Sequence, residues 1–198
     1  MAESDELVSI NPSGFLNLLL HVFRFWSQQI GGEKHVVYGL LLGTIEGNMR
    51  HVTKIVPIAH KKRPDLEMGA EFMKEVGKVN RFELESQSMS EVIGWYRSSN
   101  DGIKFIARDI KNHITFQEFN PKFIGLIIDP ELYLNPDEGG FSIYRLKGDK
   151  YYNMMTDYYK IPWEIRPIED SREILANFQG YIKNYFKNKP LITELDEY

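Results

Sequence analysis

Apolar residues recur near the start of the chain with the spacing of an amphipathic helix. Between residues 15 and 26 they fall at i, i+4, i+7, i+8 and i+11, so they share one face of a helix. Pro12 suits the first turn of this helix, and the glycine pair at 31–32 ends it. The pattern predicts a helix whose core-facing residues are Phe15, Leu19, Val22, Phe23 and Trp26.

The chain then changes to the patterns of strands. The run HVVYGLLLG (35–43) is continuously apolar and ends in glycine, which predicts a buried strand. The turn residues IEGN separate it from RHVTKIVPIA (50–59), whose alternation predicts a partner strand. Pro162 interrupts the last apolar segment and places it at a sheet edge or a bend. Further strands are predicted at 91–96, 122–129, 140–148 and 157–167.

Three more helices are predicted after the first strands. The segments 66–82 and 104–119 repeat apolar residues with helical spacing. Asp170 and Glu173 form a capping box, which predicts that the last helix begins there. The apolar positions of the first two of these helices are Met68, Phe72, Met73, Val76 and Val79, and Ile106, Ile110 and Ile114.

Strands and helices alternate along the chain, without an internal repeat or a linker. This order predicts a single α/β domain in which a mixed β-sheet is flanked by helices. We place that domain at residues 1–168, and a C-terminal helix with an acidic tail at residues 169–198. Apolar residues make up 42% of the chain, which is enough for a substantial core.

Charge and cysteine content narrow the functional classes. The formal net charge is −4, whereas dedicated nucleic-acid binders are usually basic, so a nucleic-acid partner is not expected. The chain has no cysteine, which excludes disulfides, cysteine-type zinc sites and a thiol nucleophile. The first residues, MAESDELVSI, lack the apolar core of a signal peptide, and no segment has the length and apolarity of a membrane span. We therefore expect a cytoplasmic or nuclear protein without a membrane partner.

Three motifs occur in the order and spacing of a known family. They are YGLLLG (38–43), GWYRSS (94–99) and NPKFIGLIIDP (120–130). Together they resemble the MPN domain, which is the fold of the JAMM metalloproteases. The resemblance covers roughly residues 8–168 and implies a curved β-sheet flanked by helices.

In active members of that family, a glutamate, two histidines, a serine and an aspartate build a zinc site. The two histidines and the aspartate bind Zn²⁺, and a water takes the open position. The glutamate acts as general base, and the serine helps to hold the oxyanion. The resemblance assigns these five positions, in the same order, to Val36, Arg97, Ser99, Ile106 and Asp109. The aspartate alone is retained.

These replacements remove the chemistry of the site. Arginine has no lone pair for a metal, serine is a poor zinc ligand, and valine cannot accept a proton. The chain therefore resembles the inactive MPN-minus subunits, and we expect neither enzyme activity nor a cofactor. Such subunits pair with an active MPN protein in the proteasome lid, the signalosome, initiation factor 3 and deubiquitinase complexes. The resemblance implies a scaffold or adaptor that dimerises with another MPN-domain protein and contacts ubiquitin or a ubiquitin-like protein.

Two other functions stay open at this stage. A hydrolase with a rebuilt zinc site would use Asp109 with His113, one helical turn further on, or with His60. A translation- or RNA-associated subunit is the other alternative, by analogy with the initiation-factor members. His35 lies close to the vacant glutamate position, but we interpret it as a surface residue on the opposite face of its strand.

Two contacts are predicted from these residues. In the emptied site, the guanidinium of Arg97 is expected to stand where the metal stood and to bond Asp109. In the alternative arrangement, Arg97 turns into solvent and Asp109 only caps its helix. For partner binding, one stripe of the 66–82 helix is expected to form the dimer contact, through Met68, Phe72, Met73 and Val76.

Overall fold

The computed structural model describes residues 5–26, 35–61, 70–135, 139–148 and 156–166 of the chain. The strands within these residues are β1 (Leu7–Ile10), β2 (Val36–Glu46), β3 (Met49–Lys61), β4 (Glu91–Ser98), β5 (Ile124–Ile128), β6 (Phe141–Leu146), β7 (Tyr158–Ile161) and β8 (Trp163–Ile165). The helices are α1 (Pro12–Trp26), α2 (Ala70–Glu85), α3 (Ala107–Phe119) and α4 (Pro130–Leu134).

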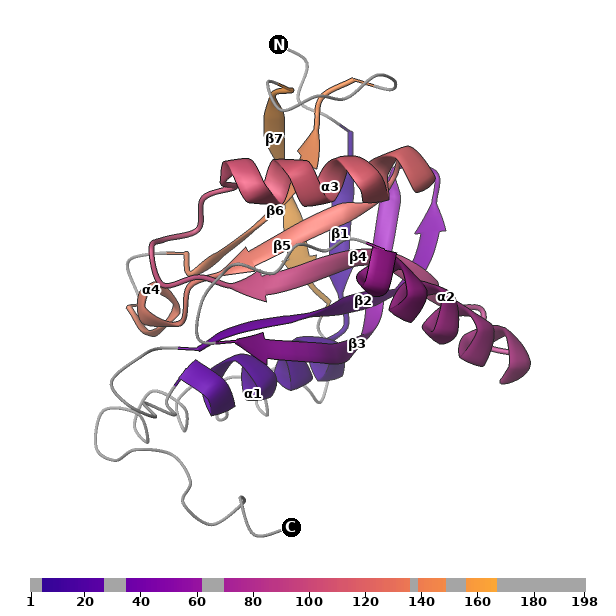
Figure 1. Cartoon of the computed structure of the whole chain (residues 1–198), viewed down its shortest axis with the longest axis horizontal. Coiled ribbons are helices and arrows are strands. Elements are labelled where there is room, and N and C mark those ends of the chain that lie inside the picture. Colours follow the sequence, from indigo (N-terminus) through magenta and orange to yellow (C-terminus); the bar gives the residue numbers. More distant parts are fainter. Residues whose placement is uncertain (1–4, 27–34, 62–69, 136–138, 149–155, 167–198) are drawn as a thin grey trace, which may run out of the picture.

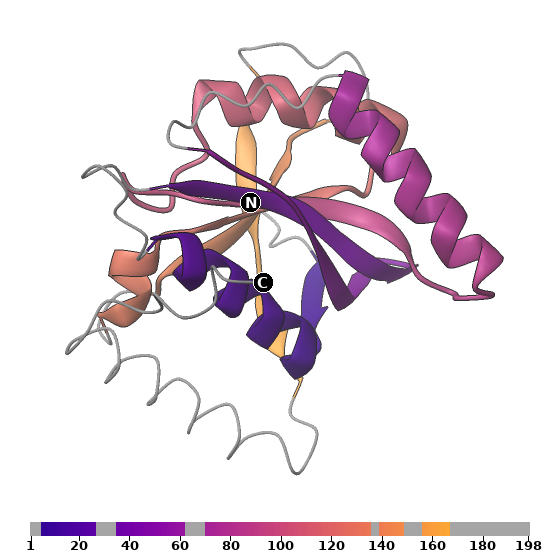
Figure 2. The same ribbon diagram turned by 60° about the horizontal axis from the view of Figure 1, so that its bottom comes forward.

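The strands form one curved sheet, with the order β7-β6-β5-β4-β2-β3-β1-β8 (Figure 1). Helix α1 covers one face of this sheet, and α2 and α3 cover the other (Figure 2). The predicted mixed α/β architecture is therefore confirmed. No helix within the described residues is long and apolar enough to cross a membrane.

The middle of the sheet is built from the segments whose apolar runs predicted buried strands. β2 pairs antiparallel with β3 on one side and with β4 on the other. The turn between β2 and β3 contains a residue in the left-handed region, Gly47, with a φ of 60°. β4 pairs parallel with β5, and α3 lies in the crossover between them. Because this crossover begins where β4 ends, the amino end of α3 lies close to the carboxyl end of β4.

Two apolar cores hold the helices to the sheet. Side chains alternate along each strand, so successive residues of β2 point to opposite faces. Val37 and Leu41 pack on the side of α1, whereas Val36 and Leu40 pack on the side of α2 and α3. The predicted apolar face of α1 is confirmed for Phe15, Leu19, Val22 and Phe23, which are buried, and Trp26 is partly buried against the same core.

Pro162 separates two strands that lie at opposite edges of the sheet. β7 pairs with β6 at one edge, and β8 pairs with β1 at the other. The sheet is therefore nearly closed, because strands consecutive in the chain occupy its two edges. The predicted edge or bend at this proline is confirmed.

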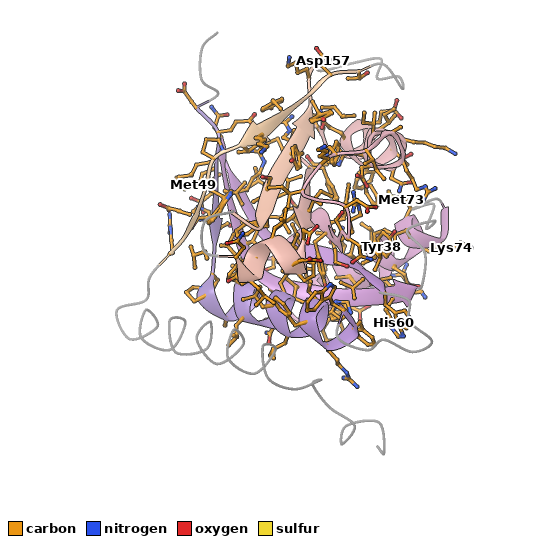
Figure 3. The ribbon with its side chains drawn as sticks, turned by 90° about the vertical axis from the view of Figure 1, so that its left-hand side faces the viewer. Tyr38, Met49, His60, Met73, Lys74 and Asp157 are labelled. Carbon is orange, nitrogen blue, oxygen red and sulfur yellow. The ribbon has the colours of Figure 1, made fainter. Side chains whose placement is uncertain are left out.

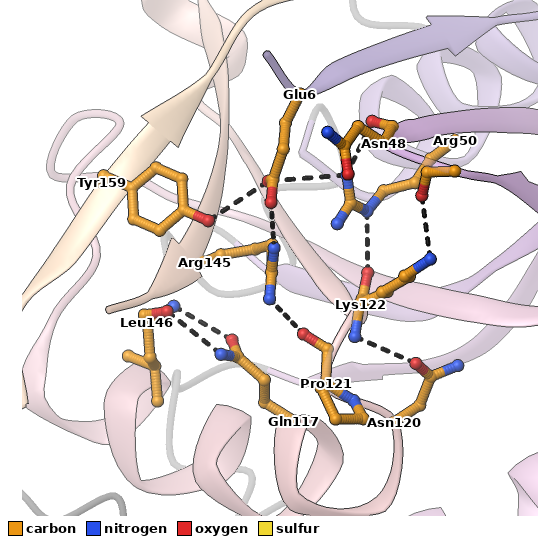
Figure 4. Close-up of polar contacts among 11 residues, drawn as sticks. Glu6, Asn48, Arg50, Gln117, Asn120, Pro121, Lys122, Arg145, Leu146 and Tyr159 are labelled. Atoms are coloured by element: carbon orange, nitrogen blue, oxygen red, sulfur yellow. Dashed lines mark hydrogen bonds and ion pairs between the residues drawn. The ribbon is translucent and has the colours of Figure 1, made fainter. Parts of the chain in front are cut away.

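A buried network of charges links the strands near these two edges (Figure 4). The Glu6 carboxylate, just before β1, pairs with Arg145 of β6 and lies 3.5 Å from Nη1 of Arg50 in β3. The Tyr159 hydroxyl of β7 donates to the same carboxylate at 3.1 Å. Arg50 also donates from Nε to the backbone oxygen of Lys122 at 2.8 Å. One carboxylate therefore joins four strands or their ends.

The helix at 104–119 differs from its prediction in its start and in its buried face. It begins at Ala107, because the Asp109 carboxylate caps it by accepting a hydrogen bond from the Ile106 N–H. The predicted isoleucine stripe is confirmed in part, because Ile110 and Ile114 are partly buried against the core, whereas Ile106 is 43% exposed. Polar side chains with partners elsewhere in the fold make up most of the fully buried face. The buried residues of α3 are Asp109, Asn112, His113, Phe116 and Gln117.

Some predictions fall outside the described residues. These are the start of the 66–82 helix with Met68, the last helix beginning at Asp170, and the whole of residues 169–198. Helix α4 was not predicted. Its start has a clear signal in retrospect, because Asp129 caps it by accepting hydrogen bonds from two backbone N–H groups and Pro130 follows directly.

Candidate functional site

The candidate site lies where β4 ends and α3 begins. Arg97 pairs in the sheet with Tyr38 and shares its face, which α2 and α3 cover. After β4, the Ser99 N–H donates to the Ile128 backbone oxygen at 2.8 Å. The Gly102 N–H donates to the Asp129 carboxylate at 2.7 Å. These two bonds hold the connecting loop against the end of β5 and so fix its approach to α3.

Arg97 and Asp109 form a buried bidentate ion pair. The guanidinium Nε lies 2.7 Å from Oδ1, and Nη2 lies 2.6 Å from Oδ2. The two side chains are only 4% and 3% exposed. Two parallel N–H···O bonds to one carboxylate form the strong geometry for this pair of groups. The predicted ion pair is therefore confirmed.

Both members of the pair have further partners. Nη1 of Arg97 donates to the Ser98 backbone oxygen at 3.0 Å, and Nη2 donates to that of Lys104 at 3.2 Å. Oδ2 of Asp109 accepts a bond from the Ile106 N–H at 2.8 Å, which caps α3. The ion pair and the helix cap, which were set against each other as alternatives, therefore occur together. Buried charges persist when they are paired and hydrogen-bonded in this way.

The other positions of the emptied site supply no catalytic group. Val36 is 1% exposed and offers only methyl groups to the core. Ser99 is buried, and its hydroxyl accepts a hydrogen bond from the Asp101 N–H at 3.3 Å. Ile106 stands at the start of α3 with an apolar, partly exposed side chain. The five positions together therefore contain one carboxylate, whose two oxygens both face Arg97.

This set of residues does not fit a zinc ion. A catalytic zinc site needs three protein ligands with lone pairs and an open fourth position for water. Here a guanidinium, which has no lone pair, lies against both oxygens of the one carboxylate. These five side chains therefore cannot form the zinc site that was described above for active MPN domains.

The two histidines of the rebuilt-site alternative do not join Asp109. His113 is fully buried, and its Nδ1 accepts a hydrogen bond from Trp95 Nε1 at 3.0 Å. Burial lowers the pKa of His113 to about 3. His60 stacks on Phe25 of α1, on the other side of the sheet, with ring centroids 3.9 Å apart. Within the described residues, no three histidine, aspartate or glutamate side chains are placed to hold a metal ion.

The interpretation of His35 as a surface residue is wrong. It is only 6% exposed. The strand pattern places it correctly on the opposite face from Val36, because its ring lies 5.9 Å from that of His60 on the side of α1. The neighbouring ring of His60 comes from β3, and a contact with another strand leaves no trace in the local pattern of β2.

Helix α2 exposes different apolar residues from those predicted. Phe72 and Val76 are 5% and 2% exposed, and the Phe72 ring contacts that of Phe116 in α3 at 5.7 Å. Met73 is partly buried against the same core. These side chains serve the core of this chain because α2 lies over the sheet at its first turns, so a partner cannot reach Phe72 and Val76 in this fold. Partner contact through α2 stays a prediction.

The far end of α2 extends beyond the sheet (Figure 2). Large apolar side chains are exposed at this end and in the turn that follows it, and we call them the α2 tip. Their exposed fractions of 65%, 76% and 88% are high for residues of this kind. The α2 tip consists of Phe82, Leu84 and Met89.

Comparison with known proteins identifies the family of the chain. The family described as "JAB1/Mov34/MPN/PAD-1 ubiquitin protease" matches residues 3–122, which is more than half of the sequence. The match includes β4 and α3, the two elements that carry Arg97 and Asp109. The chain therefore belongs to the JAB/MPN family, and the resemblance noted from its three motifs is confirmed.

A curated relative is the NAD(+) hydrolase TcpA of Theionarchaea archaeon (strain DG-70-1). It is 28% identical to this chain over 108 residues. The matched segment makes up 54% of this chain and 31% of the relative. The chain therefore spans less than a third of that protein, most of which lies outside the match.

Proposed function

We propose that this chain is a catalytically inactive MPN domain that acts as a scaffold or adaptor by binding another MPN-domain protein. The observation that carries the proposal is the buried bidentate pair of Arg97 and Asp109. It stands at positions where the family resemblance implies metal ligands. Because the guanidinium supplies the charge that keeps Asp109 satisfied, the fold needs no metal at this place.

A binding role is what remains when the reactive groups are replaced and the fold is kept. The exposed apolar α2 tip supports this role, since such side chains in contact with a partner lose their exposure to water. We include ubiquitin or a ubiquitin-like protein as a second ligand, since the family description names a ubiquitin protease.

NAD(+) hydrolysis is not part of this proposal. That activity is named for a relative of which the match covers 31%. The name belongs to the whole relative, and the greater part of its length lies outside the segment shared with this chain.

The purified protein is expected to contain far less than stoichiometric zinc and to leave lysine-linked diubiquitin uncut. The reason is that Arg97 and Ser99 replace the two histidine ligands and Val36 replaces the base. Zinc is measured by elemental analysis after dialysis into metal-free buffer, and cleavage is measured on gels with and without added Zn²⁺. Stoichiometric zinc, or cleavage that a chelator abolishes, contradicts the proposal.

Two designed variants distinguish the effect of the missing zinc ligands from the effect of the missing base and oxyanion donor. Arg97→His with Ser99→His returns two imidazoles beside Asp109 and is expected to stay inactive, because base and oxyanion donor are still absent. Adding Val36→Glu and Ile106→Ser restores the full set of residue types and serves as the matched reference. Cleavage by the first variant at the rate of the second contradicts this expectation, because it shows that Val36 and Ile106 do not limit the activity.

We place the docking of the MPN partner at the α2 tip. Phe82→Asp with Leu84→Asp is expected to weaken capture of that partner at least about tenfold, because two buried charges replace two buried apolar contacts. The partner is first identified as an MPN-domain protein that co-elutes from the native cell, and binding of the purified pair is then measured by calorimetry.

The matched control for this change is Phe119→Asp. Phe119 is 64% exposed, like Phe82, but it lies at the end of α3. This variant is expected to bind as the wild type does, and both variants are expected to keep the melting temperature. Equal binding by the α2-tip variant and the wild type places the interface elsewhere on the chain.

A further inference from the structure

Three histidines from three elements gather at the end of α1, outside the site described above. His21 of α1 shares a hydrogen bond with the Tyr96 hydroxyl of β4, which lies 2.7 Å from its Nδ1. Phe25 of α1 stacks on His60 of β3, with ring centroids 3.9 Å apart and planes at 14°. His35, just before β2, lies 5.9 Å from the same His60 ring. We call His21, His35 and His60 the histidine cluster.

The histidine cluster is built for uncharged rings. His35 is 6% exposed, and neither of its ring nitrogens has a hydrogen-bond partner within the described residues. Burial, together with nearby His60 and Arg24, lowers the pKa of His21 to about 4. Burial, together with His35 and Arg24, also lowers the pKa of His60.

We propose that the histidine cluster is a proton-operated latch, which holds the last turns of α1 on β2 and β3 at neutral pH and releases them on acidification. The groups that face one another here are His21 and Arg24 from α1, His35 from just before β2, His60 from β3, and Tyr96 from β4. Acid can only add positive charge to this set. Within the described residues, no ion pair joins a carboxylate to any of the three histidines.

The entry point for the proton is His60. It is exposed, whereas the other two rings are half-buried or buried. Figure 3 shows it at the opposite side of the molecule from Met49, which begins the same strand. Once His60 carries a charge, Arg24 of α1 repels it, and separation of α1 from the strands relieves that repulsion.

The sign of the effect follows from the lowered pKa values. A histidine whose pKa is lower in the latched form than in the released form binds protons more readily after release. The latch is therefore fully closed above the ordinary histidine pKa of about 6.5 and opens as the pH falls from there toward about 4. The start of α1 stays in place, because Phe15, Leu18 and Leu19 pack in the apolar core and neither a histidine nor an arginine of α1 lies before position 21.

Backbone hydrogen exchange on the full chain tests the latch. Exchange is compared at about pH 7.5 and about pH 5, after correction for intrinsic rates. Residues 20–26 are expected to lose protection by roughly tenfold or more at the lower pH. β5, which lies inside the sheet between β4 and β6, is expected to keep its protection. Equal loss in both segments indicates general acid unfolding and overturns the proposal.

Substitution of the histidines decides whether they cause the change. His35→Phe with His60→Phe keeps the aromatic packing, replaces two imidazole rings of the cluster and is expected to abolish most of the acid response. His51→Gln removes a histidine outside the cluster, one that lies 3.9 Å from Glu46, and is expected to keep the full response. An acid response of wild-type size in the double variant overturns the proposal.

A second measurement keeps the test decisive if the double variant does not fold. His60→Phe alone changes an exposed position and keeps its stack on Phe25. The ring signals of His21 are then titrated by NMR in the wild type and in this variant. Its pKa is expected to rise in the variant, because the charge on His60 that lowers it is gone. An unchanged pKa shows that the rings titrate independently and that no latch exists.

Discussion

Replacement of Arg97 by alanine is expected to lower the free energy of unfolding by roughly 3–5 kcal/mol, because it leaves a buried carboxylate without its cation. Asp109 then keeps the Ile106 N–H and loses both guanidinium bonds. For a domain of this size, each kcal/mol corresponds to about 2–4 °C in melting temperature. Thermal and urea unfolding of the wild type and Arg97→Ala measure the difference.

Two further variants show that the loss comes from the buried charge. Arg166 is 55% exposed and lies 3.7 Å from Glu164, so Arg166→Ala is the matched surface control and is expected to cost less than about 0.5 kcal/mol. Arg97→Met with Asp109→Leu removes both buried charges and is expected to regain most of the lost stability. If Arg97→Ala costs no more than the surface control, the buried pair does not stabilise the domain.

Much of the fold could be predicted because local sequence patterns determine several of its helices, strands and turns. The apolar period of α1, the continuous apolar run of β2 and the proline at 162 each act within a few residues, and the structure follows all three. The pairing of Arg97 with Asp109 could be predicted for a different reason. The family resemblance implies that the end of one strand lies beside the start of a helix. Opposite charges at these two positions, Arg97 and Asp109, can then form an ion pair.

The buried polar face of α3 could not be predicted, because the partner of each polar group comes from a distant segment. Gln117 donates to the Leu146 backbone oxygen and accepts from the Leu146 N–H, both at 3.0 Å. His113 receives its hydrogen bond from Trp95. When the sequence of a helix is considered alone, such polar residues are expected to face solvent. Only a hydrogen-bond partner from another segment offsets the cost of burying them. The stripe of α2 is ambiguous in a similar way, because methionine and phenylalanine suit a core and an interface equally well.

The same limit applies to the charges near the two edges of the sheet. Nothing in the local sequence of Glu6 distinguishes it from the acidic residues before it, yet it stands between two buried arginines (Figure 4). Arg50 is 1% exposed, and burial lowers its pKa, whereas the nearby Glu6 carboxylate acts in the opposite direction. The carboxylate therefore stabilises the nearly closed sheet by holding β3 and β6 beside the start of β1.

Glu6→Gln is expected to lower the free energy of unfolding by about 3 kcal/mol, because two buried guanidinium groups are left facing each other without a neutralising charge. Glutamine keeps the shape of the side chain and one acceptor oxygen, so the loss reports the charge. Glu46→Gln is the matched control, since Glu46 is 74% exposed and lies 3.9 Å from its partner His51. Its cost is expected to stay below about 0.5 kcal/mol. Equal melting temperatures for the two variants would show that Glu6 contributes no more than a surface charge and that apolar packing alone closes the sheet.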